Sequence, residues 1–353
     1  MASRPALGAA DSAAIDGLRG LAALIVVASH ASGMGLNLIP GLSLAGTGKY
    51  GVYLFFVISA FLLTNQWLQA PPGGPGTSGA LGRYMVRRVF RIYPLYAVVL
   101  LVGWLLPRGL GVPMDGPAVW THLTLREGRE IYWSVPVEFK YYLAIPLVAW
   151  LLASRLSPGW KWLALIMSVL LSLWMFPPSL SPLNSIALGD YLPVFICGSA
   201  TAWACRAGVF PASSAAGGAA RFGPDLFLGV LMAATVPAVL QTLGAQAPLD
   251  LLHRQFLAWG VFWSLVLLCV LRGWLPAWAA ALRWPPLQAC GRWCFGIYLL
   301  HMPALHLAKR LPLPEFSHGW VGLAIALAVA AVAHLVIELP AMRWAGRITR
   351  RRA

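Results

Sequence analysis

The feature that most constrains the fold of this chain is the recurrence of long apolar stretches along its length. An α-helix needs about 20 apolar residues to cross the hydrocarbon core of a bilayer. The chain is 59% hydrophobic and only 10% charged, whereas soluble domains carry about 25% charged residues. We therefore predict an all-α polytopic membrane protein, a bundle of about ten transmembrane helices in contact with the lipid bilayer. The expected spans are 17–35, 51–70, 92–107, 131–153, 162–177, 189–205, 224–243, 255–272, 292–308 and 319–341.

The net charge of +15 would suit a nucleic-acid-binding protein, but its distribution argues against that class. The basic residues lie in short clusters between the apolar stretches. When they are assigned to alternate sides of a ten-helix bundle, most fall on the side that holds both ends of the chain. Positive residues gather on the cytoplasmic side of membrane proteins. We therefore expect both termini in the cytoplasm, a multi-pass location in the cell (inner or cytoplasmic) membrane, and no nucleic acid partner.

The connections between the stretches are short, so we expect a single membrane domain over residues 1–353, with no appended soluble domain. Residues 71–82 and 211–224 are rich in Pro, Gly, Ser and Ala, a composition typical of flexible linkers. The five cysteines show no CxxC spacing and no histidine at metal-binding spacing, so we interpret them as small hydrophobic residues and expect no metal site. They are Cys197, Cys205, Cys269, Cys290 and Cys294.

Ionisable side chains inside membrane helices are costly, so each one is a candidate functional residue. Residues 17–30 read GLRGLAALIVVASH, an apolar run bounded by Arg19 and His30. Eleven residues of α-helix turn through about 1100°, so both side chains share one face, about 16 Å apart along the axis. We expect Arg19 at the cytoplasmic mouth of a cavity and His30 deep on its wall. The alternative is an arginine that extends to the membrane surface and a histidine bonded to a neighbouring helix.

Residues 83–96 read RYMVRRVFRIYPLY and bring four arginines into a helix without an acidic residue. Arg88 and Arg91 are i,i+3 neighbours and can project together. Guanidinium groups bind phosphate in a bidentate manner, so this segment indicates an anion site. The alternative is a basic cluster that only anchors the topology.

Residues 132–147 read YWSVPVEFKYYLAIPL. Ser134, Glu138 and Tyr142 are spaced by four and share one helix face. Counted from opposite membrane surfaces, Glu138 and His30 reach similar depths. A carboxylate beside an imidazole tunes a general base, so we predict that Glu138 supports His30. The alternative is a structural pair of Glu138 with an arginine or a tyrosine.

Residues 295–303 read FGIYLLHMP and place Tyr298 and His301 on one face at i,i+3. A role in the cavity and a role as a hydrogen-bonding strut are both open for His301. We assign His306, His334 and Glu338 to structure, with Glu338 as a cap or as the partner of a helix-end arginine. The residues predicted to line the cavity or contact an acceptor are Asp16, Ser134, Tyr142, Tyr298 and His301.

Taken in order, these motifs resemble the membrane acyltransferase-3 family, the OafA-type acyltransferases. Two departures stand out: Ala60 replaces a usual glycine, and Cys294-Phe295 replace a usual Ser-Tyr. The resemblance runs from residue 15 to residue 340. The matching segments are IDGLRGLAALIVVASH with its Arg-x10-His pair, GVYLFFVISAFLLT, RRVFRIYPLY, WSVPVEFKYYLAIPL, YLLHMP and IELP.

The resemblance implies transfer of an acyl group, usually acetyl from acetyl-CoA, to a hydroxyl of a sugar or glycan, while some relatives acylate small molecules such as macrolide sugars. It implies that His30 is catalytic, that Arg19, Arg88 and Arg91 bind acyl-CoA, and that Glu138 supports the site. Acyl-CoA would be a co-substrate, with no permanently bound cofactor.

The rival class is a proton-coupled transporter or flippase, because deep ionisable residues also suit a carrier. The inverted repeats that carriers often show are not evident. The acceptor, the acyl chain, the choice between direct transfer and an acyl-histidine, and the oligomeric state are open at the level of sequence.

Overall fold

The computed structural model describes residues 7–69, 79–106, 114–211, 222–245 and 252–351. Within these ranges the chain is helical and forms no β-strand, apart from one isolated bridge between Ile39 and Leu42. The all-helical class predicted from the sequence is therefore confirmed. The two predicted linkers, 71–82 and 211–224, lie largely outside the described residues.

The described helices range from 4 to 26 residues in length. Two of them depart from α-helical geometry, namely η1, a 3-10 helix, and η3, a π-helix. In chain order they are α1 (Ala9–Gly33), α2 (Gly48–Leu68), α3 (Ala80–Leu105), α4 (Gly116–Leu123), η1 (Glu130–Trp133), α5 (Ser134–Ala153), α6 (Pro158–Met175), α7 (Leu188–Ala207), α8 (Gly223–Ala234), α9 (Pro237–Thr242), α11 (Phe256–Arg272), α12 (Pro276–Leu282), α13 (Pro285–Arg292), α14 (Cys294–Lys309), α15 (Glu315–Ala333), η3 (His334–Glu338) and α16 (Leu339–Arg351).

Six helical segments in the described part of the chain are long and apolar enough to cross a membrane. The number is seven if α11 and α12, bent by 91° at their junction, form one span. The remaining spans of the ten predicted are still a prediction. So are the sides of the membrane on which the two termini lie. One predicted span, 224–243, is divided into α8 and α9. The break falls before Pro237, which has no backbone donor and disfavours helix at the residue before it.

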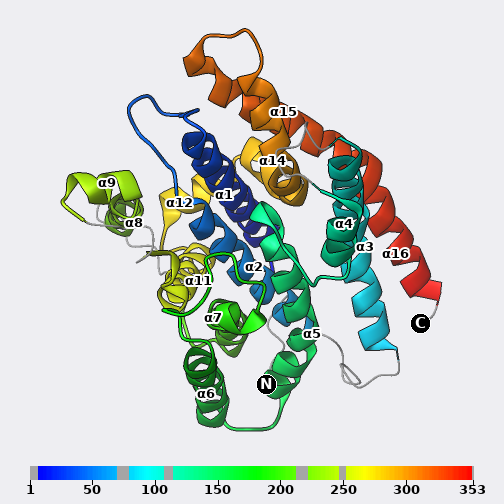
Figure 1. The fold of residues 1–353 in the computed structure, drawn as a ribbon. Coiled ribbons are helices and arrows are strands. Elements are labelled where there is room, and N and C mark those ends of the chain that lie inside the picture. Colours follow the sequence, from blue (N-terminus) through cyan, green and yellow to red (C-terminus); the bar gives the residue numbers. More distant parts are fainter. Residues whose placement is uncertain (1–6, 70–78, 107–113, 212–221, 246–251, 352–353) are drawn as a thin grey trace.

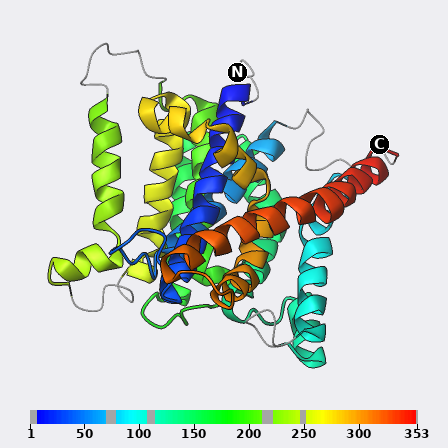
Figure 2. The same cartoon turned by 90° about the horizontal axis from the view of Figure 1, so that it is seen from above.

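Helices α1 and α2 lie side by side at the centre of the bundle, with α7 and α11 against α2 (Figure 1). The C-terminal helices cover another flank, where α15 packs on α14 and α16 packs on α3. Figure 2 shows α8 and α9 at the periphery, away from this centre. Helix α2 is apolar nearly all round, as expected for a helix that is buried on most sides.

Two glycines explain why α1 can pack so closely against α12 and α13. A Cβ atom on Gly17 would lie 1.9 Å from the carbonyl oxygen of Leu282, and one on Gly20 would lie 2.1 Å from that of Leu287. The backbones therefore touch, and no larger residue fits at either position without moving a helix. This close contact fixes the rotation of α1, and with it the direction in which Arg19 projects.

The departure at Ala60 is accommodated by the facing helix. The methyl group of Ala60 is fully buried against α7, where a Cβ on Gly198 would lie 2.9 Å from it. A small residue therefore stands on each side of the contact, and α2 and α7 remain closely packed.

Candidate active site

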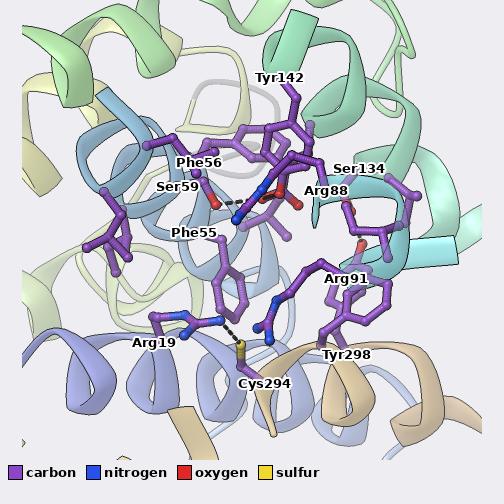
Figure 3. Close-up of a pocket in the computed structure, with 18 of the residues that line it drawn as sticks. Arg19, Phe55, Phe56, Ser59, Arg88, Arg91, Ser134, Tyr142, Cys294 and Tyr298 are labelled. Atoms are coloured by element: carbon purple, nitrogen blue, oxygen red, sulfur yellow. Dashed lines mark hydrogen bonds between the residues drawn. The ribbon is translucent and has the colours of Figure 1, made fainter. Parts of the chain in front are cut away.

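A cavity of about 330 Å³ lies in the centre of the bundle, between residues that are far apart in the sequence. We call it the arginine cavity because Arg19, Arg88 and Arg91 all line it (Figure 3). The structure thus brings together the three arginines that the sequence placed in two separate motifs. The other polar or sulfur-bearing residues on its wall are Ser59, Ser134, Glu138, Tyr142, Cys294, Tyr298 and Met342.

Two of the arginines are held by weak acceptors. Arg19 Nη2 donates to Cys294 Sγ at 3.2 Å, and Arg91 Nη1 donates to Met342 Sδ at 3.2 Å. The guanidinium groups of Arg19 and Arg91 both point toward Cys294 in Figure 3. Sulfur accepts hydrogen bonds poorly, so both side chains keep strong donor capacity for an anion. Arg19 also forms an ion pair with Asp16 at 3.6 Å. Asp16, a predicted cavity residue, is not among the residues that line the arginine cavity.

Arg88 is positioned by aromatic rings instead. Its guanidinium lies 5.8 Å from the centre of the Tyr84 ring and 5.9 Å from that of Tyr142, at cation–π distance. Its Nε is buried and finds no hydrogen-bond partner among the described residues. A buried donor without a partner is costly, and an anion in the arginine cavity would supply one.

Glu138 is engaged with neighbours in the arginine cavity. Its Oε1 accepts hydrogen bonds from Ser59 Oγ at 2.5 Å and from Tyr142 OH at 2.7 Å. The alternative of a Glu–Tyr pair is the one observed. No hydrogen bond joins Glu138 to His30 in the described part of the chain, so the structure does not form the predicted pair. Similar depth in the membrane fixes neither helix's rotation, and the two side chains line different cavities.

His30 lines a second cavity of about 360 Å³, at the end of α1. We call it the histidine cavity. Two residues, Val52 and Tyr298, line both cavities, so the arginine and histidine cavities meet at these side chains. The polar residues on the wall of the histidine cavity are Ser29, His30, Lys49, Glu130, Asn184, His253 and Tyr298.

The hydrogen bonds of the two histidines determine which nitrogen of His30 is free. His301 Nδ1 contacts the carbonyl oxygens of Tyr298 at 2.7 Å and Ile297 at 3.2 Å, so it must carry the proton. His301 Nε2 is then an acceptor, 3.0 Å from His30 Nδ1, which also lies 3.0 Å from the carbonyl of Val26. The proton of His30 therefore sits on Nδ1, as inferred from its partners. Nε2 of His30 is left unprotonated, as a general base requires.

Tyr298 connects the site to η1 and α5. Its hydroxyl donates to the carbonyl of Ile131 and accepts from Ser134 Oγ at 2.9 Å. These bonds fix the ring between the two cavities. Of the predicted cavity residues, Ser134 and Tyr142 line the arginine cavity, Tyr298 stands at the junction, and His301 lies behind His30.

Two residues that the sequence assigns to structural roles have hydrogen-bond partners in the described part of the chain. Glu338, expected to cap a helix or pair with an arginine, instead accepts from His334 Nδ1 at 2.7 Å within η3. His306 Nδ1 lies 2.9 Å from the carbonyl oxygen of Met302, four residues earlier on its own helix. Both observations agree with structural roles.

Sequence reasoning missed four polar residues of the histidine cavity. These residues, Lys49, Glu130, Asn184 and His253, lie in connections between the apolar stretches. The signal available was their position next to the outer ends of predicted spans. The sequence could not show that these separate ends surround His30.

Comparison with protein families matches residues 12–337 to the acyltransferase-3 family, described as an acyltransferase domain. The chain is 27% identical over 386 residues to acyltransferase MdmB of Streptomyces mycarofaciens, an alignment that covers 94% of this chain and 92% of the relative. No solved structure matches the chain significantly. The family match covers most of the chain and nearly all the residues that line the two cavities. The chain therefore belongs to the acyltransferase-3 family, as the motifs had predicted, and is an acyltransferase.

Proposed function

We propose that this protein is a multi-pass membrane O-acyltransferase. It moves an acyl group, acetyl in the expected case, from acyl-CoA to a hydroxyl of a sugar or glycan. The observation that carries the proposal is the pair of cavities that meet at Val52 and Tyr298. One presents three arginines, two of which donate to sulfur acceptors, and the other presents an imidazole whose Nε2 is unprotonated.

The donor enters from the basic end of the bundle, which we place in the cytoplasm of a cell-membrane protein. A smaller cavity of about 170 Å³ lies beside the arginine cavity and is lined by Arg83, Arg87 and Arg88. Arg88 lines both, so a row of guanidinium groups leads along α3 from the helix start to Arg91. Such a row suits the phosphates of acyl-CoA. The thin thioester arm then reaches the junction at Tyr298.

The acceptor hydroxyl occupies the histidine cavity. His30 Nε2 takes its proton while the oxygen attacks the thioester carbonyl. The new C–O bond forms, the C–S bond breaks, and the proton passes from the imidazole to the CoA sulfur. An acyl-imidazole at the same Nε2 is the alternative route. Incubation of the enzyme with acetyl-CoA alone distinguishes the two, because only that route acetylates His30 before an acceptor is added.

The test is acetyl transfer by purified protein, with cell-envelope glycans as acceptors and mass spectrometry as the readout. Loss of a general base lowers turnover by about 10²–10⁴-fold, so we expect His30→Ala to be nearly inactive. Full acetyl-CoA-dependent activity of His30→Ala would overturn the proposal. A carrier of another solute, the rival class, would not be stabilised against heat by acetyl-CoA, whereas a donor-using enzyme would be.

A further inference from the structure

The connection between α4 and η1 leads into Glu130, the first residue of η1, which has a strained conformation. Glu130 has a φ of 47°, and Leu125 at the other end of the connection has a φ of 58°. Residues with side chains rarely adopt this left-handed region, which favours glycine. Such strain persists only where the surroundings enforce it, and it often marks a functional position.

Specific bonds enforce the conformation. His122 is fully buried, and its Nε2 accepts a hydrogen bond of 3.0 Å from the backbone N–H of Arg129. Its Nδ1 lies 2.7 Å from the carbonyl of Ala118. On the other side of Glu130, the carbonyl of Ile131 accepts from Tyr298. The residue is therefore fixed between two anchors, one in α4 and one in α14.

This geometry places Glu130 on the wall of the histidine cavity, which His30 also lines. Glu130 is the one carboxylate among the described residues that line this cavity. It makes no hydrogen bond or ion pair within the described ranges. The nearby carboxylates are already engaged, since Glu138 accepts from Ser59 and Tyr142 and Glu127 pairs with Arg129 at 2.5 Å.

We propose that Glu130, and not Glu138, is the carboxylate that serves His30. It is a positioning residue that stabilises the imidazolium formed when Nε2 takes the proton of the acceptor. An opposite charge near a base favours its protonated form, and this is the part that a carboxylate plays beside a catalytic histidine. Glu130 is exposed, so solvent screens it in the empty cavity. An acceptor that fills the cavity excludes water and strengthens the interaction.

This inference rests on the proposed function for its chemical meaning, but it can be tested without turnover. Diethyl pyrocarbonate reacts with an imidazole only in its unprotonated form. The rate of modification at His30 therefore reports the titration of that side chain. The purified full chain would be treated over a pH series at low ionic strength, and peptide mass spectrometry would follow His30. The other ionisable side chains around it are Lys49, His253, Tyr298 and His301, which are the same in every variant.

We expect Glu130→Gln to move the pH midpoint of modification at His30 down by about 0.5–1 unit. This is less than the 1–3 units of a close buried charge because Glu130 is exposed. Glu130→Gly should give the same displacement without a loss of thermal stability, since glycine suits the local φ. With acetyl-CoA as donor, both substitutions should lower kcat by about tenfold, because one pKa unit of charge stabilisation corresponds to a factor of about ten. The KM for acetyl-CoA should stay unchanged.

The matched controls are Glu315→Gln, an exposed carboxylate at the start of α15 outside the cavity, and Glu138→Gln. Both should leave the midpoint at its wild-type value. Superimposable profiles for wild type and Glu130→Gln would overturn the inference, as would a displacement produced by Glu138→Gln instead. If wild type transfers no acyl group, the proposed function fails while the titration still decides the role of Glu130. If His30→Ala is inactive and Glu130→Gln is normal in both assays, only this inference fails.

Discussion

At the scale of single residues, His301 decides how His30 can act. It donates to a carbonyl through Nδ1 and accepts from His30 through Nε2, which leaves Nε2 of His30 as the base. The same logic governs other catalytic histidines, whose second nitrogen is fixed by a neighbouring group. The contact is possible because the last turn of α1, which holds His30, lies next to the middle of α14, which holds His301.

His301→Ala should therefore lower kcat by about ten- to a hundredfold, the usual cost of losing a group that orients a histidine. The KM for acetyl-CoA should not change, because His301 lies away from the arginine cavity. Steady-state kinetics with His306→Ala as the control would check this. A His301→Ala enzyme with wild-type kcat would show that His30 needs no such orientation.

The sequence predicted much of the site at this scale, and its failure was specific. Helical spacing placed Ser134, Glu138 and Tyr142 on one face, and all three line the arginine cavity. Spacing within one helix says nothing about the rotation of another helix around its own axis. The pairing of Glu138 with His30 depended on that rotation, and so did the contact between His30 and His301.

At the scale of elements, α1 is positioned by direct backbone contact with α12 and α13. Gly20→Ala should clash with the carbonyl of Leu287 and destabilise the protein by about 1–3 kcal/mol, as overpacking does. The matched control is Gly33→Ala at the other end of α1, where a Cβ meets nothing within 4 Å. The thermal midpoint of each variant is the measurement. Equal midpoints for the two alanine variants would contradict the close packing.

The connection from α4 to η1 should respond to acid through His122. Burial lowers the pKa of His122 below its ordinary value, and its Nε2 can accept the hydrogen bond from the backbone N–H of Arg129 only in the neutral form. The stability it contributes is fully present above the ordinary pKa of about 6.5. It declines as the pH falls from there toward the depressed value of the folded state.

We therefore expect the thermal midpoint of the wild type to fall between about pH 7 and pH 5, and to fall less in His122→Gln. A fluorescence-monitored melting series at matched ionic strength measures both. An identical pH dependence in the two proteins would show that His122 does not hold the connection.

The sequence located most elements but not their limits. The helix predicted at 17–35 begins at Ala9, and the one at 319–341 continues through η3 to Arg351. In both cases polar residues extend a helix beyond its apolar stretch, so hydropathy alone places the start of the first helix too late and the end of the last one too early. The strained connection that carries Glu130 has no signature in hydropathy, because tertiary contacts enforce it.

At the scale of the whole molecule, two cavities of different chemistry meet in the middle of one bundle. This arrangement separates the binding of an anionic donor from the activation of a neutral hydroxyl. Helix α7 covers the predicted span 189–205 but carries Asp190 and Arg206, and it is not among the six described segments that are long and apolar enough to cross a membrane. Since α7 packs against α2, α6 and α11, much of its surface faces protein and need not be apolar.

The most direct measurement compares His30→Ala and Arg91→Ala in one preparation of purified protein, with acetyl-CoA binding followed by thermal stabilisation and turnover followed by acetyl transfer. Loss of a charge-assisted bond costs about 1.5–3 kcal/mol, so Arg91→Ala should weaken acetyl-CoA binding by about ten- to a hundredfold. His30→Ala should bind acetyl-CoA like the wild type and transfer almost none of it. The opposite result, in which His30→Ala keeps wild-type turnover or Arg91→Ala keeps wild-type donor affinity, would contradict the division of work between the two cavities.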